Sequence, residues 1–393
     1  MSLDTDLLTR VRRRLTEGTK APTRGAVVEA VSGEPNQAPL GGTTLLRLGG
    51  LLYDELAGAG PLAALLADPA VTDVLVNGPG EVWVDRGAGM ERTEVTFTDA
   101  ETVRRLAQRL AASCERRLDD ASPYVDARLP DGTRLHAVLP PVAVQGPYLS
   151  LRTVRHRAFT VSELIRAGTL TIDAAQIVTT LVRARLAYVI SGGTGSGKTT
   201  LLTTLLGLVP GRERIVIVED AAELRPAHPH VVTLQARPSN VEGTGSVGLR
   251  ELVRQALRMR PDRLVIGECR GPEVVDLLGA LNTGHEGGAG TLHANRATDV
   301  PVRLEALGLL GGLSREALHA QLAASLQVVL HLGHSGAGRS LEEICLLLPA
   351  GPARFVHAMT AWRRDSGPGP AATALARLIA EAGIRPPSIL ALP

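Results

Sequence analysis

The stretch that decides the fold of most of the chain is Leu186–Leu206, LAYVISGGTGSGKTTLLTTLL. Its opening LAYVIS is an apolar run that predicts a buried strand, and the closing LLTTLL predicts a helix. Between them, GGTGSGKTT matches GxxxxGK[ST] in the context that this motif requires, with a strand before it and a helix after it. The glycines let backbone N–H groups close around a phosphate, and the following helix adds the positive end of its dipole. The stretch therefore predicts a P-loop that binds a nucleoside triphosphate.

Two side chains of this P-loop have specific predicted roles. Lys198 is one of only two lysines in an arginine-rich chain, and we expect it to act in catalysis by reaching the β- and γ-phosphates of ATP. Thr199 is expected to supply a hydroxyl ligand to Mg²⁺. The residues expected to contact the nucleotide through the loop are Gly192, Gly193, Thr194, Gly195, Ser196, Gly197, Lys198, Thr199 and Thr200.

Carboxylates follow two other apolar runs, at the point where each predicted strand ends. Residues 215–218 are followed by Glu219 and Asp220, and residues 264–267 are followed by Glu268. Because ligands of open parallel sheets bind at the carboxyl ends of strands, Glu219 and Glu268 are both predicted to be catalytic. One is expected to hold Mg²⁺, directly or through water, and the other to orient or deprotonate the attacking water. We assign the ion, through a water, to Glu268; the alternative is a pair of solvated acids.

Two histidines flank a glycine-rich turn in TGHEGGAGTLHA, residues 283–294. Seven residues separate His285 from His293, with no cysteine partner, which is not the spacing of a zinc site. We predict that both act in the catalytic site, as sensors of the γ-phosphate or as a link between hydrolysis and movement. The alternative is a pair of histidines with purely structural hydrogen bonds.

From about residue 160 the sequence alternates between helical and strand patterns, which predicts an α/β fold with a mostly parallel sheet. The clearest predicted strands are residues 186–191, 214–219, 231–235 and 263–268. We expect the ATPase domain to span residues 160–350. Residues 351–393 begin with a Gly/Pro-rich segment and are expected to form a C-terminal tail with a short helix at 371–382.

A smaller α+β domain is predicted over residues 42–153. It begins with a helical pattern and contains two hairpins, whose turns are expected at residues 77–80 and 130–133. Thr98–Glu101 fits a capping box at the start of a helix.

Residues 1–41 are expected to form an N-terminal helix and a linker. The helix, over residues 3–17, has interleaved arginines and is expected to be solvated, with a membrane-surface helix as the alternative.

Arginines on the small domain are candidates for contact with the triphosphate. Arg128, Arg134 and Arg152 fall on its predicted strands. Most arginines are solvated, but a domain that precedes a P-loop core can lend one to the nucleotide, within the chain or across a subunit boundary. A second set is predicted on one helix: Arg250, Arg254, Arg258 and Arg260.

The overall composition argues against several classes of protein. A net charge of +2, with only 3 Phe, 2 Trp and 4 Tyr, argues against direct binding of nucleic acid. Three cysteines without a CxxC pair argue against a disulfide framework or a structural zinc site. No apolar run is long enough to span a membrane, and no secretory signal is visible. We therefore expect a cytoplasmic protein.

Four ordered motifs resemble those of the type II/type IV secretion ATPase superfamily: GGTGSGKTT, IVIVEDAAEL, ALRMRPDRLVIGECRG and LNTGHEGGAGTLHAN. Two further segments, VTDVLVNGPGEVWVDR and SPYVDARLPDGTRLHAVLPP, resemble the N-terminal domain of the branch that powers Tad/Flp-type pilus assembly. The resemblance covers about residues 45–345. It implies a RecA-like ATPase domain behind a PAS-like N-terminal domain, in a hexameric ring with nucleotide held between the two domains.

The resemblance also implies roles for individual residues. Glu219 would be the catalytic base, and Gly267-Glu268 would be an atypical Walker B end in which the usual aspartate is missing. The family's histidine box and its N-terminal-domain arginines near the phosphates match His285, His293, Arg134 and Arg152.

The function implied by the resemblance is a cytoplasmic hexameric ATPase at the inner face of the cell membrane. It would hydrolyse ATP to power assembly of a Tad/Flp-type pilus, or export of a substrate, through inner-membrane platform proteins. The alternatives are a traffic ATPase for conjugal DNA transfer and an ATP-dependent scaffold. Residues 331–340, HLGHSGAGRS, depart from the family's usual basic stretch, and we transfer no role to them.

Overall fold

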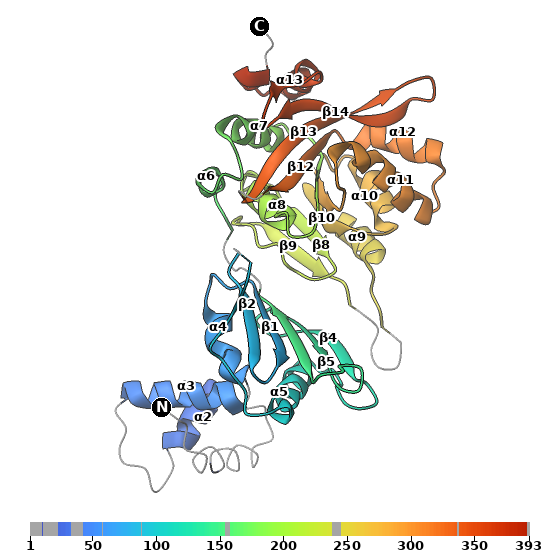
Figure 1. The fold of residues 1–393 in the computed structure, drawn as a ribbon. Coiled ribbons are helices and arrows are strands. Elements are labelled where there is room, and N and C mark those ends of the chain that lie inside the picture. The colour runs from blue at the N-terminus through green and yellow to red at the C-terminus, as the bar shows by residue number, and fades with distance from the viewer. Residues whose placement is uncertain are drawn as a thin grey trace. The chain divides into compact units, whose positions relative to one another are not determined.

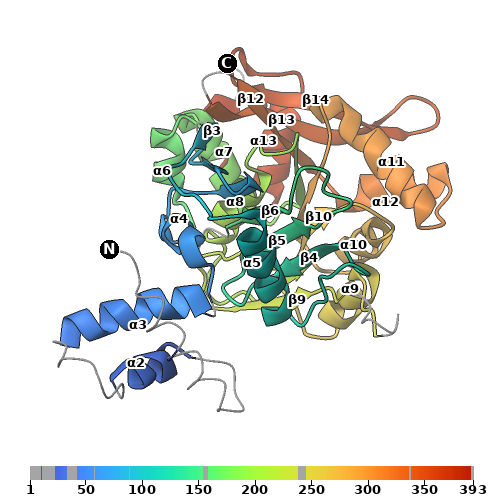
Figure 2. The same ribbon diagram turned by 60° about the horizontal axis from the view of Figure 1, so that its bottom comes forward.

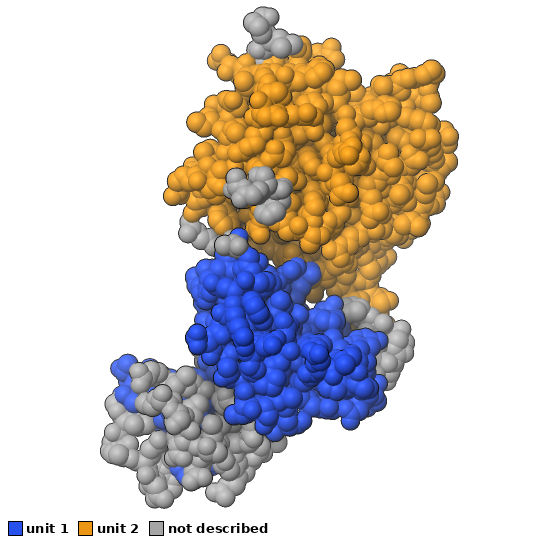
Figure 3. Space-filling view, in the orientation of Figure 1, with its two compact units in different colours: residues 1–155 blue, residues 156–393 orange. Residues whose placement is uncertain are grey.

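The computed structural model describes residues 10, 23–32, 42–56, 58–87, 89–153, 158–237, 245–335 and 338–390. The chain divides into two compact units, unit 1 with residues 1–155 and unit 2 with residues 156–393 (Figure 3). Each unit has a hydrophobic core of its own.

Unit 1 is built on a six-stranded antiparallel sheet in the order β3-β2-β1-β6-β5-β4 (Figure 1). The strands are β1 Asp73–Gly78, β2 Glu81–Asp85, β3 Met90–Arg92, β4 Tyr124–Arg128, β5 Arg134–Val138 and β6 Tyr148–Arg152. Both predicted hairpins are confirmed, as β1–β2 and β4–β5. Alternate side chains, such as Val74, Leu135 and Leu151, form one buried face with helix α5, Ala100–Ser113.

Helix α5 begins at an aspartate rather than at the predicted capping box. The Asp99 carboxylate accepts a hydrogen bond from the Thr102 N–H at 2.7 Å and is the N-cap. The prediction that Thr98 and Glu101 cap the helix is therefore wrong, because the neighbouring carboxylate satisfies the free N–H groups of the first turn.

Four helical segments precede the sheet of unit 1: α2 Arg24–Ser32, α3 Gly42–Leu56, η1 Gly60–Leu62 and α4 Ala63–Ala67. The predicted linker is wrong at α2, because Val27 and Val31 pack against Leu52 of α3, side by side with it (Figures 1 and 2). The basic helix predicted over residues 3–17 lies outside the described residues, apart from residue 10. Among the described helices, none has both the length and the apolar character needed to cross a bilayer.

Unit 2 contains a nine-stranded sheet in the order β15-β14-β13-β12-β7-β11-β10-β8-β9. Its strands are β7 Tyr188–Gly192, β8 Ile215–Glu219, β9 Val231–Gln235, β10 Arg263–Cys269, β11 Ala289–Leu292, β12 Val328–Ser335, β13 Gly338–Ala350, β14 Phe355–Arg363 and β15 Gly367–Pro368. Strands β7 to β12 run parallel, which confirms the predicted α/β fold, and β13 to β15 add antiparallel pairs.

Helices cover both faces of this sheet (Figure 1). One face packs against α6 Val161–Arg166, α7 Ile172–Arg183, α8 Lys198–Leu206 and α13 Ala372–Glu381. The other packs against α9 Leu249–Leu257, α10 Glu273–Leu281, α11 Val300–Leu310 and α12 Arg315–Ser325. The single-turn helices η2 Ala297–Asp299 and η3 Ser388–Leu390 complete the unit. Strands buried on both faces become continuous apolar runs, as β7 and β8 are.

The C-terminal segment, residues 351–393, is part of unit 2 and not the predicted tail. Gly351, with φ of 71°, lies in the turn between β13 and β14, and Gly367, with φ of 77°, begins β15, so the Gly/Pro-rich stretches belong to the sheet and its connections. Trp362 of β14 is 2% exposed and packs with Leu375 of α13 in the core. The predicted short helix at 371–382 is confirmed as α13.

Candidate active site

The P-loop joins the end of β7 to the start of α8 and forms an open cradle. Gly195 and Gly197 have φ of 74° and 94°, which glycine adopts at little cost. A Cβ added at Gly193 or Gly195 would meet no atom within 4 Å. The Ser196 Oγ is buried, with no hydrogen-bond partner among the described residues. Open space beside backbone N–H groups and an unpartnered hydroxyl fits a phosphate group.

Lys198 begins α8, and its ammonium group turns back toward the loop. Its Nζ donates to the carbonyl oxygens of Gly192 at 3.0 Å and Gly193 at 2.9 Å. Burial lowers the pKa of Lys198, and the nearby Glu268 carboxylate partly opposes that shift. Because neutral carbonyls do not balance a largely buried positive charge, this position favours an anion.

His293, which directly follows β11, lies between Lys198 and Glu268. Its Nδ1 is 3.4 Å from Lys198 Nζ, and its Nε2 is 2.5 Å from Glu268 Oε1. Burial, followed by repulsion from Lys198, lowers the pKa of His293. In its neutral form the ring can accept from the Lys198 ammonium through Nδ1, while Nε2 lies in contact with the carboxylate. The three residues therefore form a connected chain beside the P-loop.

Glu268, on β10, is also held by an arginine that the sequence analysis did not identify. Arg270 donates through Nε to Glu268 Oε2 at 2.7 Å, and its Nη2 contacts the same oxygen. This hydrogen bond raises the pKa of Arg270. The signal in the sequence that could have identified Arg270 is its position two residues after Glu268, directly after the end of β10.

A steric constraint explains why position 267 is a glycine, where a Walker B strand usually has an aspartate. A Cβ on Gly267 would lie 2.6 Å from the Cγ of Glu219, whose side chain crosses from the neighbouring strand β8. Glu219 is 4% exposed, and its Oε1 accepts from the N–H groups of Glu223 at 3.0 Å and Leu224 at 3.1 Å. Gly267 therefore lets a buried carboxylate lie next to Glu268 and hold the loop that follows β8.

Residues 55–339 match the family described as Type II/IV secretion system protein. The chain belongs to this family. A Mycobacterium tuberculosis protein provisionally named a conjugal transfer protein is 56% identical over 347 residues, 86% of this chain and 98% of its own length. The conjugal transfer protein TrbB of Rhizobium radiobacter is 30% identical over 289 residues, 72% of this chain and 85% of its own length.

Solved structures of secretion ATPases share the fold of this chain. The pilus retraction motor PilT with bound ADP has a TM-score of 0.53 and 21% identity, covering 75% of this chain and 83% of its own. The Yersinia pseudotuberculosis ATPase DotB has a TM-score of 0.51 and 14% identity, covering 83% and 81%. The superfamily predicted from the motifs is confirmed, and the chain is a secretion-system ATPase.

In this secretion ATPase, the two predicted histidines lie at opposite ends of the parallel strands. We call the side where these strands begin the amino edge of the sheet, and the side where they end the carboxyl edge. Strand β11 begins after His285 and ends before His293, so only His293 is at the carboxyl edge with the P-loop. His285 Nδ1 lies 3.2 Å from the Ala280 carbonyl near the end of α10. Within one chain the structure therefore does not bring His285 to the P-loop, because the turn before β11 belongs to the amino edge, and its catalytic role stays a prediction.

The amino edge of the sheet also holds a buried and paired arginine. Arg263, the first residue of β10, is 1% exposed, and its Nε donates to Glu213 at 2.7 Å. Its Nη1 and Nη2 donate to the carbonyl oxygens of Gly287 at 3.2 Å and Val182 at 3.0 Å. Arg185 also pairs with Glu213, at 3.2 Å. Every nitrogen of the buried guanidinium thus has a partner.

The candidate arginines of unit 1 form one row across its sheet. Arg128 on β4 is the register partner of Arg134 on β5, which is the partner of Arg152 on β6. Arg152 Nε in turn donates to Asp73 of β1 at 2.8 Å. Because cross-strand partners project from the same face, the row concentrates positive charge at one end of that face.

The four arginines predicted on one helix separate into two pairs. Arg250 and Arg254 lie on α9, and both contact Asp276, at 2.7 and 3.3 Å. Arg258 and Arg260 follow the end of the helix at Leu257.

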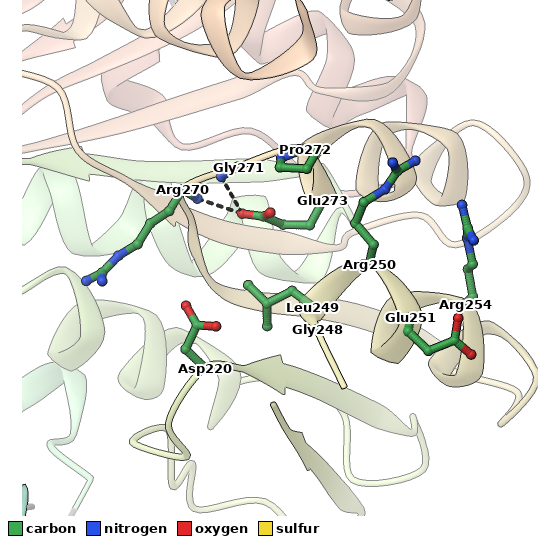
Figure 4. A pocket seen from close by; sticks show the side chains of 10 residues that line it. All are labelled: Asp220, Gly248, Leu249, Arg250, Glu251, Arg254, Arg270, Gly271, Pro272 and Glu273. Atoms are coloured by element: carbon green, nitrogen blue, oxygen red, sulfur yellow. Dashed lines mark hydrogen bonds between the residues drawn. The ribbon is translucent and has the colours of Figure 1, made fainter. Parts of the chain in front are cut away.

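A pocket of about 580 Å³ opens between the starts of α9 and α10 (Figure 4). It is lined by Asp220, Gly248, Leu249, Arg250, Glu251, Arg254, Arg270, Gly271, Pro272 and Glu273. Figure 4 shows the Glu273 carboxylate bonded to the backbone N–H groups of Arg270 and Gly271, which satisfies the start of α10. No P-loop residue lines this pocket, so it adjoins the nucleotide site at Arg270 without being part of it.

Proposed function

We propose that this secretion ATPase powers a type IV secretion machine of the conjugal transfer kind. The support is the conjugal transfer function for which its relatives are named, one of which matches over nearly its whole length. The motifs favoured Tad/Flp-type pilus assembly first and conjugal transfer second, and the named relatives reverse that order. We propose a cytoplasmic homo-hexamer that meets inner-membrane platform proteins at the inner face of the membrane.

The observation that carries the proposed chemistry is the chain Lys198–His293–Glu268 beside an open P-loop. Thr199 and Glu268 would hold Mg²⁺, Glu268 through a water, and the ion would neutralise charge on the β- and γ-phosphate oxygens. Glu219 is proposed as the base that orients or deprotonates the attacking water. His293 would report the presence of the γ-phosphate to Glu268.

Arg134 and Arg152 are proposed to bind the phosphates, as the resemblance implies, within the chain or from a neighbouring subunit. The support is the row of arginines on one face of the unit 1 sheet. Arg134→Gln and Arg152→Gln are each expected to lower the turnover number without unfolding unit 1.

The test is the specific ATPase rate measured against protein concentration, with Lys198→Ala as the background. If the active sites are completed by residues of two subunits, the specific ATPase rate should rise steeply with protein concentration and should vanish in Lys198→Ala. Glu268→Gln is expected to bind ATP and not turn it over; retained turnover would refute the role of Glu268. A rate that stays flat while sizing shows a monomer would refute the ring.

Tad/Flp-type pilus assembly is the second candidate. The observation that favours it is the resemblance carried by the β1–β2 hairpin segment, VTDVLVNGPGEVWVDR. Replacing the natural gene by one encoding Glu268→Gln separates the two functions. Loss of DNA transfer to recipient cells supports conjugation, whereas loss of surface pili with unchanged transfer supports pilus assembly.

A further inference from the structure

A hairpin of unit 2 extends alongside the P-loop. Strand β12 pairs in parallel with β7 as far as Leu332, which lies opposite Gly192, the last residue of β7. Strand β12 then continues to Ser335, and β13 returns with Arg339 opposite His334. Because β7 has already ended, this part of the hairpin runs beside the loop and not beside the strand.

The hairpin contacts the loop at two of its glycines. A Cβ on Gly192 would lie 2.6 Å from the Leu332 carbonyl oxygen, so the hairpin backbone rests on the start of the loop. A Cβ on Gly197 would lie 3.4 Å from the Cδ of Arg339. The aliphatic part of Arg339 therefore lies over the residue that precedes α8. Its guanidinium group begins at the atom bonded to that Cδ, so it is within reach of the loop.

Arg339 differs from Arg363 and Arg364, at the end of β14, in having no hydrogen-bond or ion-pair partner among the described residues. Arg363 on β14 pairs with Glu343 at 2.9 Å, and Arg364 donates to the Gly168 carbonyl at 2.8 Å. Arg339 is exposed at the surface. A guanidinium group without a counter-ion, placed beside a loop that binds phosphate, offers paired N–H donors to phosphate oxygens.

We propose that Arg339 binds the α- and β-phosphates of the nucleotide, from the side of the P-loop opposite to Glu268 and His293. Strand β7 lies between β12 on one side and β11 on the other, so Arg339 and His293 approach the loop from different sides. The backbone N–H groups of a P-loop cradle the α- and β-phosphates, and Gly197 belongs to that cradle. ATP and ADP share these phosphates, so Arg339 contributes to binding both and not to the chemical step. The proposal rests on the P-loop being the nucleotide site.

The test is equilibrium binding of a fluorescent ADP and of a fluorescent non-hydrolysable ATP analogue to the full chain. Arg339→Gln is expected to raise both dissociation constants by about tenfold, as the loss of a charge-assisted hydrogen bond does. In steady state it raises KM and leaves kcat unchanged, because the lost contact exists equally in the ground and transition states. Arg339→Lys keeps the charge without the paired donors and is expected to restore part of the affinity.

Two further variants make the result decisive. Arg377→Gln, on the exposed face of α13, removes the same charge far from the loop and should change neither dissociation constant. Lys198→Ala should weaken both, and if it does not, the P-loop assignment itself fails. Unchanged affinities in Arg339→Gln beside a weakened Lys198→Ala would overturn the proposal alone. Weakened binding of the ATP analogue with unchanged ADP would also overturn it, because Arg339 would then read the γ-phosphate.

Discussion

Two buried cations stand at opposite edges of the same parallel sheet, and their partners differ. Arg263, at the amino edge, has the Glu213 carboxylate at 2.7 Å and two backbone carbonyls. Lys198, at the carboxyl edge, has two backbone carbonyls and a histidine nitrogen at 3.4 Å. A buried charge with a carboxylate in direct contact cannot be broken from its partner without loss of stability, whereas one with no carboxylate in direct contact is ready for an anionic ligand. The difference separates a structural edge from a functional edge without reference to any relative.

Exchanging the cation at the functional edge should give the largest effect. Lys198→Met keeps the length of the side chain and removes its charge, so turnover should fall by about 10³-fold, as when one electrostatic donor to the reacting group is lost. Because the pKa of Lys198 is lowered in the folded protein, its charge costs folding free energy, and the variant should be no less stable. Steady-state ATPase assays and chemical unfolding measure the two quantities. A large loss of stability would break the comparison.

The same exchange at the structural edge should act on stability. Arg263→Met leaves Glu213 buried with only Arg185 nearby, so the free energy of unfolding should fall by about 3 kcal/mol or more. Turnover per folded molecule should stay close to that of the parent. The double variant Arg263→Met, Glu213→Leu should recover most of the loss, because no buried charge is left unpaired; Arg185, which also loses Glu213, is 34% exposed. Urea unfolding checks all three chains, and a double variant as unstable as the single one would count against the pairing argument.

The two histidines offer a matched pair for the same comparison. His293→Ala removes the link between Lys198 and Glu268, so kcat should fall by about 10²-fold. His285→Ala removes only a hydrogen bond to the Ala280 carbonyl, which is worth about 1 kcal/mol of stability, and should leave kcat near the parent value. Single-turnover assays with a thermal melt distinguish them. A kcat loss in His285→Ala would show that this residue reaches a site in another subunit.

A methyl group at position 267 should have a smaller effect than the exchanges at Lys198, Arg263 and His293. Gly267→Ala places a Cβ where the Glu219 Cγ lies, so the side chain or strand β10 must shift, at a cost of about 2 kcal/mol. Because Glu268 is the next residue, activity should also fall. Gly279→Ala is the control, since a Cβ there meets no atom within 4 Å. Equal melting temperatures for the two variants would contradict the close approach.

Patterns that lie close together in the sequence were sufficient for much of the fold and of the site. The strand, loop and helix around residues 192–200 follow from one local motif, and the acids after two apolar runs follow from strand periodicity. The capping box was decided locally, by Asp99, and the other errors concern how segments pack and pair. Helix α2 depends on packing against α3, and residues 351–393 depend on β14 pairing with β13. Neither contact can be predicted from the local pattern of residue types alone.

The sequence alone determined that the chain has a P-loop, acids at strand ends and a secretion-ATPase motif set, because each of these is a short-range pattern of residue types. Only the tertiary structure decided which edge each group occupies. Strand order β13-β12-β7-β11-β10-β8 brings Arg339, His293 and Glu268 to the loop and leaves His285 at the other edge. That order results from burying both faces of the sheet under helices, a requirement that the whole chain satisfies together.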